Sequence, residues 1–213
     1  MLELRPLRSS RHILCLGAHC DDIEIGCGAA LMHLAEEYPQ AHFEWVVLSS
    51  NAVRAAEEGE SFEYFMQPAH SKSLRMREFR NGYFPTVIAD IKDYFEELKG
   101  GPIFDLILTH FREDLHQDHR IIADLTWNTF RDHLIVEYEI PKYDGGLGSP
   151  NLFIPVSQAL AQRKVEGLMR YFASQRDKRW FTEDTFYGLM RLRGVECNAN
   201  YAEAFYCRKA VFS

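Results

Sequence analysis

Leu14-Cys15-Leu16-Gly17-Ala18-His19-Cys20-Asp21-Asp22-Ile23-Glu24 is the stretch that decides the fold, because a strongly apolar run ends there in a histidine and two carboxylates. Residues 12–18 are apolar almost throughout instead of alternating with polar residues, which predicts a strand buried on both faces of a parallel sheet. His19, Asp21 and Asp22 follow at once. Because open α/β sheets bind ligands beyond the carboxyl ends of their strands, these side chains form one half of a candidate site.

The other half is a polar cluster at residues 110–120, which also follows an apolar run, at 103–108. It contains the sequence His116-Gln117-Asp118-His119. Catalytic zinc sites commonly use three imidazole or carboxylate ligands and leave a fourth position for water. A single histidine or aspartate at a strand end can simply cap the following helix. Two such clusters at two strand ends favour the other interpretation, in which both surround one metal ion.

Strand and helix patterns alternate along the chain. Helical periodicity from residue 25 stops before Pro39 and a β-rich run follows at 43–48, so the chain opens with a right-handed strand–helix–strand unit. Residues 50–73 are polar and predict an irregular, functional loop. Further expected elements are a short helix at 73–80, a helix at 87–98, a strand at 103–109, a helix at 120–130, a strand at 133–138, a helix at 158–174 and a closing strand at 204–211. The pattern predicts the α/β class, with a Rossmann-like, mostly parallel sheet, helices on both faces, and a single domain over residues 1–213.

The composition excludes several classes of function. The chain has 213 residues, 46% hydrophobic and 26% charged, which suffices for one globular core. The net charge of −7 argues against nucleic-acid binding, and the basic residues near 75–80 and 163–179 are spaced as on solvated helix faces. No apolar run reaches transmembrane length, and the N-terminus has no apolar leader. Five cysteines without framework spacing predict reduced thiols, so we expect a cytoplasmic protein.

These motifs resemble the PIG-L/LmbE-like family of zinc-dependent N-acetylglucosamine deacetylases. That family typically shows Ala-His-Pro-Asp-Asp before a glycine-rich helix start, which is matched by Ala18-His19-Cys20-Asp21-Asp22 and the glycines that follow. Its later His-x-Asp-His motif is matched by residues 116–119. Two weaker matches are Arg75-Met76-Arg77-Glu78, for an R-x-x-E element, and an ending at Tyr201-Ala202-Glu203-Ala204-Phe205. The resemblance covers most of the chain.

The resemblance implies hydrolysis of the N-acetyl group of an N-acetylglucosamine-type sugar or glycoconjugate, releasing acetate and a free amine. It implies one zinc ion per chain, with another divalent cation as the alternative, held by His19, Asp22 and His119. It further implies that Asp21 is the general base and that His116 stabilises the oxyanion or acts as an acid.

The resemblance also implies that Arg75 contacts sugar hydroxyls, the alternative being a surface pair with Glu78. Asp118 would hold the His116 imidazole in its protonated form through a charge-assisted hydrogen bond, which is a hypothesis from their spacing.

Cys20 departs from the family pattern, which has proline at this position. Proline fixes φ and removes an N–H, so a cysteine leaves the peptide between His19 and Asp21 more freedom. Zinc binds thiolates readily, but His19 and Asp22 already fill the local ligand positions, which favours a buried thiol in a slightly looser loop. Because both motifs keep every imidazole and carboxylate, we expect activity to be retained.

Two other functions stay open. Asp114 together with residues 116–119 approximates the H-x-H-x-D-H motif of the metallo-β-lactamase fold, which has antiparallel sheets and usually two metals. The strand–helix–strand opening and the cluster at His19 argue against it. The other alternative is a non-catalytic, Rossmann-like module that binds a sugar or nucleotide. The loop at 51–73 and the segment near Asp144 would shape the mouth of the site, but they identify neither the sugar nor the oligomeric state.

Overall fold

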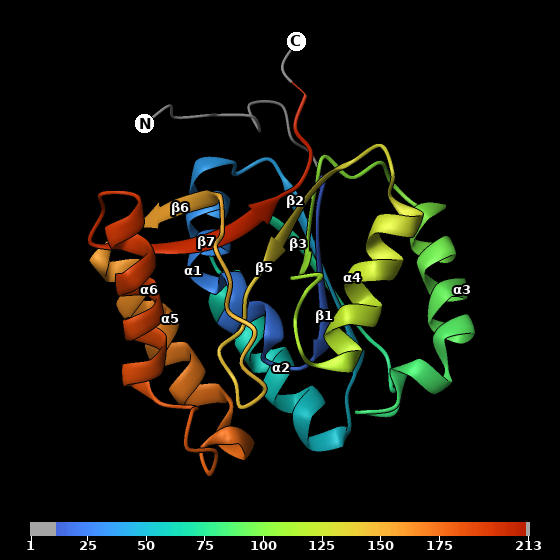
Figure 1. Cartoon of the computed structure of the whole chain (residues 1–213), viewed down its shortest axis with the longest axis horizontal. Coiled ribbons are helices and arrows are strands. Elements are labelled where there is room, and N and C mark those ends of the chain that lie inside the picture. The colour runs from blue at the N-terminus through green and yellow to red at the C-terminus, as the bar shows by residue number, and fades with distance from the viewer. Residues whose placement is uncertain (1–11, 212–213) are drawn as a thin grey trace.

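The computed structural model describes residues 12–211, and one sheet runs through this part of the chain (Figure 1). The strands are β1 (His12–His19), β2 (His42–Ser49), β3 (Ser71–Met76), β4 (Leu106–His110), β5 (Leu134–Tyr138), β6 (Leu152–Val156) and β7 (Tyr201–Cys207). Their order is β3-β2-β1-β4-β5-β7-β6. The first five strands in this order are parallel, and β7 is antiparallel to both of its neighbours. The predicted α/β class is confirmed, and the antiparallel metallo-β-lactamase arrangement is excluded.

Helices cover both faces of the sheet, as predicted (Figure 1). They are α1 (Asp22–Glu37), α2 (Ala52–Phe65), α3 (Ile88–Lys99), α4 (Gln117–Thr129), α5 (Gln158–Tyr171) and α6 (Glu183–Glu196). One core lies between the sheet and α1, α2, α5 and α6, and it contains the buried side chains of Trp45 and Phe65. The other core lies between the sheet and α3 and α4, around Phe95 and Phe130. Within residues 12–211, none of the helices has the length and apolar composition that crossing a bilayer requires.

The prediction of an irregular loop at 50–73 was wrong, because α2 occupies most of this segment. The helix is capped by Asn51, whose side-chain oxygen accepts the backbone N–H groups of Val53 and Arg54. Two of its buried positions are polar, Glu58 and Ser61. The buried face of α2 therefore lacks the continuous apolar stripe on which the sequence prediction depended.

The prediction of a short helix at 73–80 was also wrong, since this region contains most of β3. This strand lies at the edge of the sheet, pairs only with β2 among the described strands, and is mostly half-buried or exposed. An edge strand with such an exposed surface needs no apolar alternation. Strand β6 was not predicted either, because it is the opposite edge strand and contains Pro155. Helix α6 was not predicted either, and the closing strand lies at 201–207 instead of 204–211.

Helix α1 is broken at Cys27, whose φ of −148° and ψ of 18° are not helical. Large aromatic rings pack against the glycines on either side of the break. A Cβ atom on Gly26 would lie 2.1 Å from the ring of Tyr138, and a Cβ on Gly28 would lie 2.7 Å from the ring of Phe65. Only glycine permits this close approach, so α1 can pack directly onto β5 and α2 at its break.

Two buried side chains satisfy the backbone groups at this break. The carboxylate of Glu203, on β7, accepts the N–H groups of Ala29 at 3.2 Å and Ala30 at 2.6 Å. Lys164, on α5, donates to the carbonyl of Ile25 at 2.5 Å and forms an ion pair with Glu203. The Tyr-Ala-Glu-Ala-Phe ending therefore has a structural basis, because its glutamate caps the second half of the first helix.

Replacing Glu203 with alanine is expected to lower the free energy of unfolding by roughly 3–5 kcal/mol, because Lys164 would stay buried without its partner. Urea unfolding followed by circular dichroism measures this change. The control is Glu166→Ala on the exposed side of α5, which should change the free energy by less than about 0.5 kcal/mol. Equal unfolding midpoints for the two variants would contradict the capping role.

Candidate active site

The turn between β1 and α1 places three functional side chains close together. His19 ends β1, Asp22 begins α1, and Asp21 between them has a φ of 93°, in a region that is unfavourable for a residue other than glycine. The backbone N–H of His19 donates to Oδ2 of Asp22 at 2.7 Å. The Asp22 carboxylate is thereby folded back onto the end of the strand.

The end of β4 and the start of α4 supply the second group of side chains. His110 ends β4, is fully buried, and accepts the Ala18 N–H at Nε2 over 2.9 Å. His116 caps α4, since its Nδ1 accepts the N–H of Asp118 at 3.3 Å. His119 lies in the first turn of α4 and stacks on His110, with ring centroids 3.9 Å apart. Because β4 is the neighbour of β1, the two predicted clusters meet at one edge of the sheet.

Three ligand atoms form a triangle that fits a metal ion. Nδ1 of His19 lies 3.3 Å from Oδ2 of Asp22 and 3.3 Å from Nε2 of His119, and the third side of the triangle is 3.5 Å. Tetrahedral zinc with bonds of about 2.0–2.1 Å separates its ligand atoms by roughly 3.3–3.4 Å. Two imidazoles and a carboxylate are also the donor types of catalytic zinc sites. The residues present therefore fit a tetrahedral divalent cation.

Both histidines of this triangle bind a carboxylate through their other ring nitrogen. Nε2 of His19 lies 3.1 Å from Oδ2 of Asp118, and Nδ1 of His119 lies 3.1 Å from Oδ2 of Asp114. Such carboxylate partners orient metal-binding imidazoles and fix the tautomer that directs the free nitrogen at the metal. Lys142 in turn donates to Asp114 at 2.6 Å and compensates its charge.

The structure gives Asp118 a different partner from the one we hypothesised. Its carboxylate accepts the backbone N–H groups of Gly82 at 2.6 Å and Phe84 at 3.2 Å, in addition to its bond with His19. The carboxylate thus orients His19, while the bond that His116 makes with Asp118 is to its backbone N–H. The atoms of His19, His116 and Asp118 also lie close enough for a metal, but the hydrogen bond to Asp118 already engages Nε2 of His19.

The protonation states suit a cation at this position. Burial and the nearby His110 lower the pKa of His119 to about 3, so its imidazole is neutral, as a ligand must be. Burial would raise the pKa of Asp22, but the imidazoles of His119 and His110 hold it well below its usual value. Burial would lower the pKa of His19, but hydrogen bonds to Asp118 and Asp22 raise it to about 9. His19 therefore carries a proton between these carboxylates at neutral pH, and a metal ion at Nδ1 would have to replace that proton.

His116 lies beside this triangle, with its ring centroid 5.1 Å from that of His19. Because Nδ1 accepts a backbone N–H, the neutral imidazole carries its proton on Nε2 and can donate from that atom. Burial and the neighbouring His19 lower the pKa of His116 below its usual value.

Asp21 is buried and paired with an arginine that the sequence interpretation missed. Nη2 of Arg54, on α2, lies 3.0 Å from Oδ1 of Asp21. The backbone N–H of Asp21 donates to Oε2 of Glu58, also on α2, at 3.1 Å. Burial raises the pKa of Asp21 to about 7, although Arg54 opposes this shift. A carboxylate with a pKa near neutrality is suited to accept a proton.

The structure does not bring Arg75 to this cluster. Its Nε pairs with Oε1 of Glu44 at 2.8 Å, and Glu44 lies beside Leu14 near the start of β1, whereas His19 lies at the end. The R-x-x-E spacing occurs elsewhere in the sequence, including at Arg54-Ala55-Ala56-Glu57. The match at Arg54 lies on α2 next to Asp21, so Arg54 is the arginine that the fold places at the site.

Other members of the site were missed because their function depends on tertiary contacts. His110 and Asp114 are in the predicted cluster, but nothing in their spacing distinguishes a ligand from its hydrogen-bond partner. Lys142 lies beyond β5 and has no local motif. Cys20 is buried with its thiol directed at the carbonyl of Ser49, at 3.7 Å. Burial and the nearby Glu58 raise the pKa of this thiol, which argues against a thiolate ligand.

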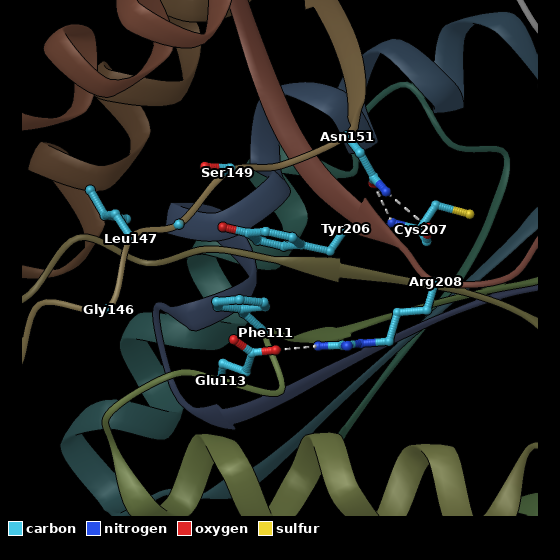
Figure 2. Close-up of a pocket in the computed structure, with 10 residues that line it drawn as sticks. Phe111, Glu113, Gly146, Leu147, Ser149, Asn151, Tyr206, Cys207 and Arg208 are labelled. Carbon is cyan, nitrogen blue, oxygen red and sulfur yellow. Dashed lines mark hydrogen bonds and ion pairs between the residues drawn. The ribbon is translucent and has the colours of Figure 1, made fainter.

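A cleft of about 630 Å³ begins one residue beyond His110 (Figure 2). Its most prominent feature is the stacked pair of Phe111 and Tyr206, whose ring centroids are 3.8 Å apart. The ion pair of Glu113 and Arg208 lines the same cleft. The glycine-rich segment lines the same cleft through residues 146–149, with Gly148 next to the ring of Tyr206.

Comparison with a family model decides the relationship of this chain. Residues 14–130, more than half of the chain, match the model described as PIG-L: GlcNAc-PI de-N-acetylase. The chain belongs to the PIG-L family. The matched segment runs from β1 to the end of α4 and contains both clusters of the site.

Solved structures share the PIG-L fold over nearly the whole chain. N,N′-diacetylchitobiose deacetylase from Pyrococcus horikoshii is 17% identical, with 94% of this chain and 84% of that chain covered and a TM-score of 0.67. The zinc-inhibited form of teicoplanin deacetylase Orf2 is 14% identical, with coverage of 92% and 97% and a TM-score of 0.69. The 4-carboxy-2-hydroxymuconate hydratase GalB from Pseudomonas putida is 14% identical, with coverage of 95% and 98% and a TM-score of 0.73. Since a hydratase shares the fold with deacetylases, these likenesses establish the fold alone.

Replacing Asp114 with asparagine is expected to weaken Zn²⁺ binding by roughly 10–100-fold, because His119 loses the carboxylate that orients it. Competition with a chromogenic chelator measures the affinity. Asp124→Asn is the matched control, because Asp124 lies on the exposed side of α4 and pairs with Arg112. Unchanged zinc affinity in the Asp114 variant would contradict this role.

Proposed function

We propose that this PIG-L protein is a zinc-dependent hydrolase that removes the N-acetyl group from an N-acetylglucosamine-type sugar or glycoconjugate. The observation that carries the proposal is the triangle of His19, Asp22 and His119, whose sides match a tetrahedral zinc site, with a buried carboxylate next to it. Family membership and the deacetylases among the similar structures support the same reaction.

The ligands of the metal are His19, Asp22 and His119. A bound zinc ion supplies Lewis acidity and lowers the pKa of its water toward about 7. Asp118 and Asp114 keep the two imidazoles oriented, and the neutral His119 is ready to bind. Zinc is preferred over magnesium because imidazole nitrogens dominate the donor set.

Asp21 and His116 carry the proton transfers. Asp21 accepts the proton of the water that attacks the acetamide carbonyl, and its raised pKa keeps it basic enough near neutral pH. Nε2 of His116 donates to the developing oxyanion or to the leaving amine. Arg54 holds the Asp21 carboxylate through Nη2, and its other nitrogens contact the Ser174 hydroxyl and the Glu57 carboxylate, which fixes the guanidinium in place.

Asp21→Asn is expected to lower kcat by roughly 10²–10⁴-fold, the usual contribution of a general base. Free amine released from a panel of N-acetylated sugars by the zinc-loaded protein measures the activity. Asp93→Asn, at an exposed position of α3, is the matched control and should behave as the unmodified protein. An Asp21 variant with full activity would overturn the assignment of the base, and a wild-type protein that releases no amine from the panel would overturn the proposed function.

Removal of the metal should abolish amine release, and Zn²⁺ should restore it at one equivalent per chain, because one set of three ligands carries the activity. Dialysis against a chelator followed by titration with Zn²⁺ measures both effects. A non-catalytic sugar- or nucleotide-binding module would instead bind its ligand equally well before and after chelation.

A further inference from the structure

The conformation of Asp21 is unfavourable and is not fixed by the local sequence. Its φ of 93° is rare for a residue with a side chain. Cys20 precedes it, so the rigid φ that proline would provide at that position is absent. The Cys20 thiol makes only a long contact of 3.7 Å with the Ser49 carbonyl. Contacts from elsewhere in the fold must therefore hold this turn.

Helix α2 makes two contacts with Asp21 from positions one turn apart. Arg54 binds the side chain, at 3.0 Å from Oδ1, and Glu58 binds the backbone, accepting the N–H at 3.1 Å. Residues spaced by four lie on the same face of a helix, so one helix holds both the side chain and the backbone of Asp21. The contact of Glu58 is the one that acts on the peptide itself.

Glu58 is fully buried, as is its neighbour Glu24. One oxygen of Glu58 accepts the Asp21 N–H, whereas the hydroxyl of Ser61 donates to Glu24 at 2.5 Å. Among the described residues, the remaining oxygen of each glutamate has no hydrogen-bond partner. Burial and the proximity of Glu24 raise the pKa of Glu58 well above its usual value. A neutral carboxyl still accepts a backbone N–H through its carbonyl oxygen.

We infer that Glu58 is a positioning residue, which holds the left-handed peptide of Asp21 and thereby aims the carboxylate of Asp21 at the reacting water. This inference rests on the proposed function, in which Asp21 is the general base. Glu58 touches neither the ligand triangle nor the substrate in this account, and it acts through the backbone of Asp21. It compensates for the missing proline at position 20 by a tertiary hydrogen bond.

The test compares three substitutions on α2. Glu58→Gln keeps an acceptor oxygen and the shape of the side chain, Glu58→Met removes the acceptor, and Glu60→Gln is a matched control at an exposed position. Each zinc-loaded variant is measured for amide hydrogen exchange at Asp21, for zinc affinity, and for kcat and KM on an N-acetylated sugar that the wild type cleaves.

Glu58→Met should speed exchange of the Asp21 amide by roughly tenfold through loss of one hydrogen bond. It should lower kcat by up to roughly 10²-fold, the cost of misplacing a catalytic group, with KM and zinc affinity nearly unchanged. Glu58→Gln should restore most of kcat and the slow exchange. Glu60→Gln should match the wild type in every measurement.

Three results would overturn the inference. The first is an unchanged rate of amide exchange at Asp21 in Glu58→Met, and the second is a decrease in kcat that is explained by a decrease in zinc affinity. The third is a kcat of Glu58→Gln as low as that of Glu58→Met. If Glu58→Met does not fold, Glu58→Asp takes its place, because its shorter side chain withdraws the acceptor. Hydrogen exchange at Asp21 is measured without substrate. If the wild-type protein cleaves no sugar, the proposed function is wrong, but the exchange rates still show whether Glu58 holds the turn.

Discussion

Oδ2 of Asp22 is the atom on which the site depends. It lies 3.3 Å from an imidazole nitrogen of His19, 3.3 Å from one of His110 and 3.5 Å from one of His119. These histidines come from β1, β4 and α4, so one carboxylate connects the two strand ends and the helix that follows. Its negative charge is stable in a buried position only because imidazoles and a backbone N–H surround it. The fold thus forms an electronegative centre before any metal binds.

Sequence reasoning predicted the part of the fold that is buried on both faces. The strand at 12–18 and the helix after it were recognisable because apolar residues outnumber polar ones there. The edge strands β3 and β6 were not recognisable, because an exposed edge imposes little pattern on the sequence. Helix α2 was missed for a different reason, since polar residues occupy part of its buried face. The fold is therefore predictable where burial is apolar, and unpredictable at exposed sheet edges and where polar residues occupy a buried face.

The same distinction applies to the site. The adjacent carboxylates and the His-x-Asp-His spacing identified the residues that converge at the end of the sheet, because these are close in sequence. Their partners were not predictable, since Asp118 lies closer in sequence to His116 but binds His19 through the fold. The R-x-x-E spacing also recurs along the chain, and only the position of α2 shows that Arg54 and not Arg75 reaches Asp21.

The bond between Glu203 and the broken helix α1 has a consequence for biosynthesis. The N–H groups of Ala29 and Ala30 gain their partner only after residue 203 has left the ribosome. Until then the first helix, which carries Asp22, cannot complete its backbone hydrogen bonds. A chain truncated before β7 therefore leaves two backbone N–H groups of α1 without the acceptor that the complete sheet gives them.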